Sequence, residues 1–279
     1  MAGNYWQSSH YQQWLLDRQD LLRERHKDLV ILNEDGYRKL MIFYADFIQA
    51  LGETLGVKQQ VVATSIVYFK RFYVKNSLRS VDPLLLAPTC IFLASKVEEY
   101  GVISNHRLIQ TCQTVLKNKF SFAWNMPEYP YKISQVLECE FCLLEMMDCC
   151  LILYHPYRPL TQYVQDWPDK DVVLPVAWNV INDSYRTDIP LLYPPHQIAI
   201  ACLHMACVIT QKDTYKGWFA ELNTDFDKIL EITCQMMNLY ELWKEFEPME
   251  DIPHLHNMMP KPNLTGNNNG QQQKLLAIP

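Results

Sequence analysis

The chain has 279 residues, of which 49% are hydrophobic and 20% are charged, and its formal net charge is −6. This composition is typical of a globular protein with its own core, and the acidic balance disfavours a nucleic-acid binder with a dominant basic face. The eight glycines form no phosphate-binding motif and are few for the tight turns of β-sandwiches and barrels. No apolar run approaches the ~18 residues of a membrane span, and the first residues do not resemble a signal peptide.

The nine cysteines indicate a reducing compartment. Their number is odd, and most of them lie in apolar helical stretches, where a free cysteine behaves as a small hydrophobic residue. Cys139 and Cys142 form a CxxC pair, but no second pair of ligands follows at a spacing that would complete a zinc site. We therefore expect neither a metal nor a cofactor.

Apolar residues at helical spacing dominate the first half of the chain. Residues 8–32 predict one amphipathic helix outside the main repeat. After it the pattern predicts five helices, at residues 37–55, 59–75, 83–99, 104–117 and 130–148. No sustained alternation of apolar and polar residues supports a strand.

The second half repeats the first. It predicts five more helices, at residues 158–167, 171–186, 195–211, around Trp218 and at 225–246. Pro83, Pro88 and Ala94 recur at the same spacing as Pro190, Pro195 and Ala201, 107 residues further along. Two copies of one five-helix unit explain this match most simply. The third helix of each unit is apolar on nearly every side, which is typical of a central buried helix.

The composition changes at about Glu247, where prolines cluster and a polar low-complexity stretch follows. Such a stretch cannot bury a core, so we expect a disordered tail. The predicted organisation is an all-α chain with an N-terminal helix (1–35), a first box (36–150), a second box (151–246) and a tail (247–279).

The third helices of the two units end differently. The first ends in Lys96-Val-Glu-Glu99, whereas the aligned residues of the second are Leu203-His-Met-Ala206. Lys96 could simply complement the negative end of the helix dipole, with the glutamates solvated. A purely structural role, however, would not require the two units to differ.

A glutamate interrupts the apolar stripe of the fifth predicted helix. At 100° per residue, Glu140 falls in the middle of the stripe, whereas Glu138 and Glu145 fall on the outer face. A carboxylate in that place must be paired internally, for example with Lys96 or Arg71, or must lie where a partner covers the stripe.

The segment Leu93-Ala-Ser-Lys96-Val-Glu-Glu99, with a proline-rich helix start before it and Glu140 after it, resembles the cyclin box, and two such boxes in tandem form the cyclin fold. Residues 1–246 also resemble the C-type cyclins of the Mediator kinase module. The segments that carry this resemblance are Ala2-Gly-Asn-Tyr-Trp6, Tyr68-Phe-Lys-Arg-Phe-Tyr73, Tyr154-His-Pro-Tyr-Arg-Pro159 and Leu191-Leu-Tyr-Pro-Pro195. The resemblance implies that Lys96 and Glu140 grip the regulatory helix of a cyclin-dependent kinase. Glu98, Glu99 and Leu144 complete this predicted kinase-binding surface, with Glu99 facing basic residues near the kinase activation segment.

The resemblance also implies a non-enzymatic protein that activates the kinase, regulates RNA polymerase II transcription in the nucleus and meets other subunits of the kinase module. Direct contact with nucleic acid or membrane is not expected. The run Tyr37-Arg-Lys-Leu-Met-Ile-Phe43 departs from the MRAIL motif with which cell-cycle cyclins dock substrates. Substrate recruitment through that patch is therefore not expected.

Two further surfaces are candidates for specificity. The aromatic N-terminus would contact the kinase or Mediator if it is exposed, or would pack against the boxes if it is not. A groove for a second partner would combine one of these aromatic residues with polar residues of the second box. The alternative for those polar residues is that they simply face solvent. The N-terminal set is Tyr5, Trp6, Tyr11 and Trp14, and the groove set is Trp6, Asn182, Asp183 and Tyr240.

Three other classes fit less well. A double-box general transcription factor that binds DNA would be basic and would usually carry a zinc ribbon. An enzyme would need a nucleophile with a base, or a set of metal ligands, and neither is visible. A scaffold that bridges proteins is harder to distinguish from a kinase activator, because it differs only in leaving the turnover of the kinase unchanged.

Overall fold

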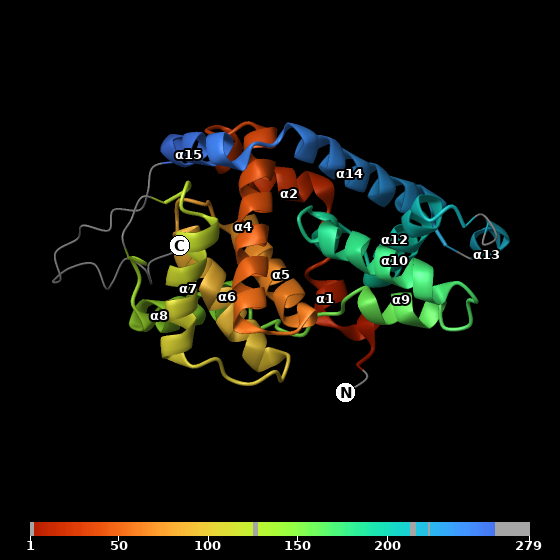
Figure 1. Ribbon diagram of the computed structural model, residues 1–279, viewed down its shortest axis with the longest axis horizontal. Coiled ribbons are helices and arrows are strands. Elements are labelled where there is room, and N and C mark those ends of the chain that lie inside the picture. Colours follow the sequence, from red (N-terminus) through yellow and green to blue (C-terminus); the bar gives the residue numbers. More distant parts are fainter. Residues whose placement is uncertain (1–2, 125–127, 213–215, 223, 260–279) are drawn as a thin grey trace.

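The computed structural model describes residues 3–124, 128–212, 216–222 and 224–259, and within these ranges the chain is helical with no strand (Figure 1). The helices of the first box are α4 (Glu34–Leu55), α5 (Gln59–Lys75), α6 (Pro83–Val97), α7 (Asn105–Lys119) and α8 (Ile133–Met146). The helices of the second box are α9 (Tyr157–Tyr163), α10 (Lys170–Ser184), α11 (Ile189–Leu192), α12 (Pro195–Ile209), α13 (Lys216–Glu221) and α14 (Phe226–Glu245). The expected all-α fold with two helical repeats is confirmed.

Each box is built around its third long helix. In α6 every residue from Pro83 to Ser95 is buried, and α4, α5, α7 and α8 pack around it. Asp82 caps this helix by accepting a hydrogen bond from the Leu84 N–H, which leaves Pro83 in the first turn, where its missing N–H costs nothing. In the second box α12 takes the same place among α9, α10 and α14. The short helix α11 was not expected, and it ends at Leu192 before Pro194 and Pro195 start α12.

The prediction of one helix over residues 8–32 is wrong. The structure divides this stretch into α1 (Ser9–Gln12), α2 (Arg18–Glu24) and α3 (His26–Leu29), after a 3₁₀ turn at Tyr5–Gln7. The Leu16 N–H donates to the Leu191 carbonyl of the second box at 2.8 Å, and Asp17 then caps α2. The periodic apolar residues thus follow the surface of the two boxes rather than one straight axis.

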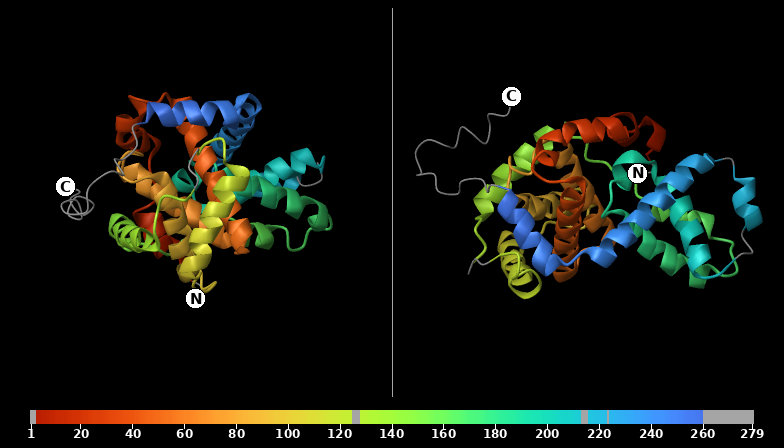
Figure 2. Two further views of the ribbon diagram at one scale, coloured as in Figure 1. Left: turned by 60° about the vertical axis from the view of Figure 1, so that its left-hand side comes forward. Right: turned by 90° about the horizontal axis from the view of Figure 1, so that it is seen from above.

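The expectation that residues from Glu247 onward bury no core is wrong for the first part of that stretch. Helix α15 (Pro248–Met258) continues along the top of the molecule from α14 and packs on α4 (Figures 1 and 2). Its Ile252 and Leu255 are buried, and His256 Nε2 lies 2.9 Å from the Tyr44 hydroxyl of α4. Packing therefore stabilises a segment whose interior proline, Pro253, and short length disfavour a helix. The expected disorder of residues 260–279 lies outside the described residues.

Two further expectations concern metals and membranes. Among the described residues no three His, Cys, Asp or Glu side chains gather as a metal site would require, and Cys139 and Cys142 are buried thiols that are not joined in a disulfide. No helix in the described part of the chain is both long and apolar enough to cross a membrane.

A buried ion pair fixes the N-terminal segment to the second box. Arg25 is buried at the end of α2, and its guanidinium donates two hydrogen bonds, of 2.5 and 2.8 Å, to the two carboxylate oxygens of Asp188. Burial alone would raise the pKa of Asp188, but the charge and hydrogen bonds of Arg25, with a further contribution from Lys70, lower it below its usual value.

We expect Asp188→Asn to lower the free energy of unfolding at pH 7 by about 3–5 kcal/mol, because it leaves Arg25 charged and buried without a carboxylate. The folded-state pKa of Asp188 is lowered, so its stabilisation is complete above the unfolded-state pKa of about 4 and is lost progressively as the pH falls from there through the lowered folded-state pKa. In urea titrations the difference in free energy of unfolding between the two proteins should therefore be full at pH 7 and smaller at pH 3.

The control is Asp20→Asn, because Asp20 pairs with Arg23 on the exposed surface of α2. This change should alter stability by less than about 0.5 kcal/mol. Equal stability of Asp188→Asn and the natural chain at pH 7 would contradict the role given to the buried pair.

Candidate functional site

Two charged side chains meet where the end of α6 lies beside α8. Lys96, in the last turn of α6, forms an ion pair with Glu140 of α8. The Lys96 ammonium also lies 4.4 Å from the centroid of the Phe92 ring. The side chain of Lys96 is 34% exposed and that of Glu140 is 10% exposed. The carboxylate is thus held at the edge of the core, with the ammonium above it at the surface.

The structure decides between the two internal partners predicted for Glu140. Lys96 is the partner, whereas the guanidinium of Arg71 lies 4.7 Å from the centroid of the Trp14 ring and donates to the Cys150 carbonyl at 3.3 Å. Glu140 is therefore paired inside the isolated chain. Because the pair lies at the surface, both groups still have hydrogen-bonding capacity toward a partner.

Helix α8 leaves part of its apolar stripe accessible. Its Val136, Leu143 and Met147 are buried in the first box, whereas Phe141 is 71% exposed. At 100° per residue, Glu140 divides the buried half of the stripe from the accessible half. We call the accessible half the α8 strip; it consists of the exposed Phe141 and the half-buried Ile133, Leu137 and Leu144. An apolar strip beside an ion pair is typical of a protein-binding surface.

Phe141 was not among the predicted site residues, although the sequence contained a signal for it. The stripe from Leu143 to Phe141 spans about 160° around the helix, which is wider than the apolar face that a surface helix needs for one core. The excess width indicates a second apolar neighbour. Leu144, which was predicted, lies in the same strip.

The structure does not bring Glu98 to this surface. Its carboxylate accepts hydrogen bonds from Gln60 and from the buried hydroxyl of Thr64, and it lies 3.9 Å from Nε2 of His155 at the start of the second box. Burial alone would raise the pKa of Glu98, but the nearby His155 and the hydrogen bonds from Thr64 and Gln60 lower it. Glu98 therefore connects the two boxes rather than extending the Lys96–Glu140 pair.

Glu99 is directed away from Glu98 by a turn of the backbone. Its φ of 53° lies in the left-handed region, which few residues other than glycine adopt, and its side chain is exposed. It stands just beyond the end of α6, two residues before Gly101, whose φ is 120°. Of the two glutamates, only Glu99 presents a free carboxylate to a partner of the α6–α8 surface.

The N-terminal aromatic residues divide between surface and core. Trp14 is only 2% exposed and packs against Arg71, so for this residue the structure shows the second alternative, packing against the boxes, and Trp14 leaves the predicted specificity surface. Trp6 is 52% exposed, and its ring stacks edge-on against Tyr11 at 4.9 Å. Tyr5 lies half-buried beneath these two rings. The predicted N-terminal surface is thus reduced to Trp6 and Tyr11, with Tyr5 in support.

The predicted groove set is only partly brought together. The Tyr240 hydroxyl donates to Asp183 at 3.1 Å, and Arg186 lies 3.4 Å from the same carboxylate. Asn182 accepts a hydrogen bond from the Tyr157 hydroxyl at 2.8 Å. Trp6 instead contacts Tyr5, Tyr11 and His196, none of which belongs to the predicted groove. Burial raises the pKa of Asp183, and Arg186 opposes the shift.

The comparisons with known proteins agree with this architecture. The family model for the cyclin N-terminal domain matches residues 5–152, and a model for a cyclin C-terminal domain matches residues 155–244. The chain belongs to the cyclin family, and it is a regulatory cyclin subunit rather than a catalytic enzyme.

Within the family the chain is similar to proteins named Cyclin-C. It is 62% identical to Cyclin-C of Drosophila melanogaster over 262 residues, which cover 94% of this chain and 98% of the relative. It is 58% identical to Cyclin-C of Rattus norvegicus over 272 residues, which cover 98% and 95%. The predicted resemblance to C-type cyclins is confirmed.

Solved kinase complexes contain chains of similar shape. A chain of the yeast TFIIK complex of Kin28, Ccl1 and Tfb3 matches with a TM-score of 0.64 and 26% identity, over 84% of this chain and 99% of that one. A chain of the Chaetomium thermophilum CAK complex matches with a TM-score of 0.69 over 91% and 87%, and at 18% identity it supports the fold alone.

We expect Thr64→Val to lower the free energy of unfolding by about 1–3 kcal/mol, because it removes the hydroxyl that contacts both Glu98 and His155 in a buried place. Thermal unfolding would measure the change. Thr54→Val is the matched control, since Thr54 is exposed and its hydroxyl bonds only to the carbonyl of Ala50 in its own helix. Equal losses of unfolding free energy for both variants would contradict a special role for the contact of Thr64 with Glu98 and His155 between the two boxes.

Proposed function

We propose that this chain binds and activates a cyclin-dependent kinase of the Mediator kinase module and thereby regulates RNA polymerase II transcription in the nucleus. The Lys96–Glu140 pair at the border of the α8 strip is the observation that carries the proposal. The similarity to Cyclin-C proteins and to a chain of the TFIIK kinase complex supports the choice of partner.

The geometry suits the recognition of a helix. Phe141 and Leu144 offer apolar area to one face of a kinase helix, and burying one phenylalanine side chain contributes about 1.5–3 kcal/mol. Beside them, Lys96 can donate to carbonyl groups, and Glu140 can accept from N–H groups at the end of that helix. Because the ion pair already orders both side chains, little of their conformational freedom remains to be lost on binding.

Activation follows from selective binding. A protein kinase is active when its regulatory helix swings inward and brings its glutamate to the lysine that positions ATP. A rigid surface that fits only the inward position shifts the equilibrium toward it. The chain therefore needs no chemistry of its own, and Glu99, free at the end of α6, would face basic residues near the kinase activation segment.

Two other surfaces are proposed for the remaining contacts. Trp6 and Tyr11 form the exposed part of the N-terminal specificity surface, facing either the kinase or a neighbouring subunit. Asp183 and Tyr240, joined by a hydrogen bond, with Asn182 on the same helix as Asp183, would receive another subunit of the module. These two surfaces are separate from the α8 strip.

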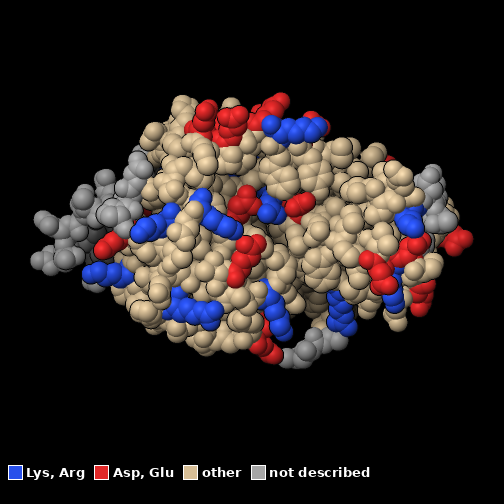
Figure 3. Space-filling model, viewed as in Figure 1, with Lys and Arg blue, Asp and Glu red and all other residues tan. Residues whose placement is uncertain are grey.

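A direct role in DNA binding has less support. Figure 3 shows lysine and arginine side chains interspersed with aspartate and glutamate over the face that it presents, without a continuous basic stripe. A protein of net charge −6 would rely on such a stripe to bind phosphates.

We expect Glu140→Ala to weaken binding to the purified kinase by about 2–5 kcal/mol, because a charged group inside the interface loses its partners. Phe141→Ala should weaken binding by about 2 kcal/mol through the loss of apolar area. Both variants should keep the thermal stability of the isolated chain within a few degrees, because Lys96 reaches solvent and Phe141 is exposed. Calorimetric titration and thermal unfolding would measure the two properties.

The matched control is Glu138→Ala, an exposed glutamate on the opposite side of the same helix, which should bind as the natural chain does. Unfolding of Glu140→Ala would make Glu140 a structural group and overturn the proposed site. Unchanged kinase binding by a folded Glu140→Ala would do the same.

A further inference from the structure

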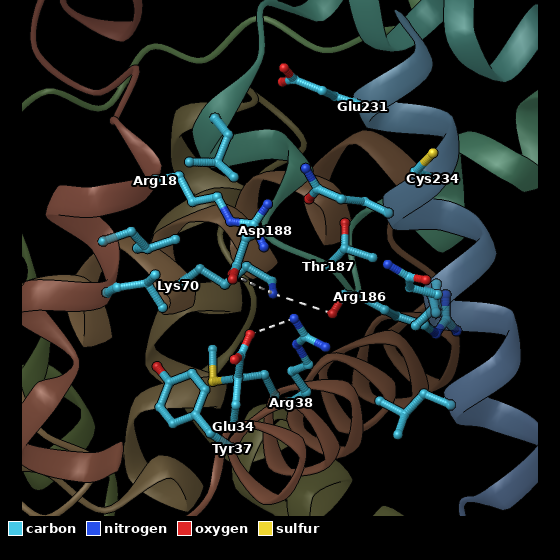
Figure 4. A pocket seen from close by; sticks show the side chains of 18 of the residues that line it. Arg18, Glu34, Tyr37, Arg38, Lys70, Arg186, Thr187, Asp188, Glu231 and Cys234 are labelled. Carbon is cyan, nitrogen blue, oxygen red and sulfur yellow. Dashed lines mark hydrogen bonds and ion pairs between the residues drawn. The ribbon is translucent and has the colours of Figure 1, made fainter. Parts of the chain in front are cut away.

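A cavity of about 440 Å³ lies between α2, α4 and α14 (Figure 4). No residue of the α8 strip lines it, and it adjoins the proposed groove only through Arg186, which pairs with Asp183. The N-terminal segment and both boxes contribute to it. Leu21 of α2, Met41 and Ile42 of α4, and Leu239 and Leu242 of α14 supply apolar wall area. An occupant of this cavity must therefore be largely apolar.

The floor of the cavity carries a cation whose hydrogen bonds are incomplete. Lys70 of α5 is 1% exposed, and its ammonium lies 3.8 Å from Asp188. Both oxygens of Asp188 already accept hydrogen bonds from Arg25. The hydrogen bond found for the Lys70 ammonium is a long one, of 3.4 Å, to the carbonyl of Arg186. Burial lowers the pKa of Lys70 to about 8, although Asp188 opposes the shift.

The rim of the cavity adds a second cation. Arg18 of α2 lines the cavity and is exposed, and it forms no ion pair with the described residues. The carboxylates of the lining are mostly engaged, Glu34 with Arg38 and Glu231 with Lys228. One ammonium and one guanidinium are thus available to an incoming anion.

The carboxylates at the rim of the cavity favour an anion with a single negative charge over a dianion. A phosphate dianion would lie close to the carboxylates of Glu34, Asp227 and Glu231, which line the same cavity. A single carboxylate carries half that charge and can be neutralised at Lys70 and Arg18. An aspartate or glutamate side chain therefore fits better than a phosphoryl group.

The apolar surface continues beyond the cavity. Leu22 of α2 is 42% exposed, and Leu230 and Phe226, one turn apart on α14, are 62% and 49% exposed. A small carboxylic acid would leave these side chains in water, whereas a peptide segment would cover them. Acidic charge and apolar side chains must then occur on one segment.

We propose that this cavity docks an apolar segment of a partner protein that carries one aspartate or glutamate, with that carboxylate bound by Lys70 and Arg18 and the apolar side chains of the segment against α2 and α14. This surface is independent of the α8 strip, so the proposal does not rest on kinase binding.

Cys234 offers a direct test, because it lines the cavity and is exposed. The full chain is incubated with the seven-residue peptide Leu-Leu-X-Leu-Leu-Gly-Cys. The Cys of the peptide is supplied as a mixed disulfide with mercaptoethanol. X is glutamate, glutamine or phosphoserine. Exchange transfers the peptide to a protein thiol and releases mercaptoethanol, and mass spectrometry with peptide mapping measures each adduct at increasing mercaptoethanol concentration.

At Cys234 the mercaptoethanol concentration that removes half of the adduct should be about tenfold higher for the glutamate peptide than for the glutamine peptide. The reason is that only the carboxylate forms charged hydrogen bonds at the floor of the cavity. At Cys149, which is exposed on the first box, the two peptides should behave alike. Arg18→Gln and Lys70→Met should reduce the preference at Cys234, whereas Arg23→Gln, on the exposed side of α2, should keep it.

Equal retention of the glutamate and glutamine peptides at Cys234 would overturn the proposal. A preference for the phosphoserine peptide over the glutamate peptide would overturn the assignment to a carboxylate. Arg18→Gln leaves the buried core intact, so this variant keeps the test decisive if Lys70→Met does not fold.

Discussion

A helix that is apolar on every side can carry charged residues only where it leaves the core. In α6 all residues from Pro83 to Ser95 are buried, so Lys96 is the first position at which the helix can present a charge to the surface. Helix α8 lies against this end and supplies Glu140. The location of the candidate site is thus a consequence of how the first box is built.

The second box also has a buried central helix, α12, but no charged pair at the end of it. In α12 the residues aligned with Lys96 and Glu98 are Leu203 and Met205, which are both buried, and the exposed His204 between them contacts Phe219 of α13. The last turn of α12 exposes Val208 and Ile209, which carry no charge. The central helix of the first repeat therefore ends in a charged pair, whereas that of the second does not.

The sequence predicted the long helices well because their apolar period is strong, and it predicted Glu140 because a charge inside that period is conspicuous. It failed where a tertiary contact overrides local pattern. The hydrogen bond from Leu16 to Leu191 divides the expected N-terminal helix, and the packing of Leu255 on α4 orders a helix within the expected tail. The direction of Glu98 could not be predicted, because it depends on Thr64 and His155, which are distant in sequence.

We propose that the α6–α8 surface turns a kinase on rather than merely holding it. The most direct measurement is the turnover of the purified Mediator-type kinase with this chain and with Glu140→Ala, both at the concentration at which the natural chain just saturates the kinase. We expect strong stimulation by the natural chain and little by Glu140→Ala at that concentration. Tight binding of the natural chain without any rise in turnover would contradict the claim, and so would full stimulation by Glu140→Ala.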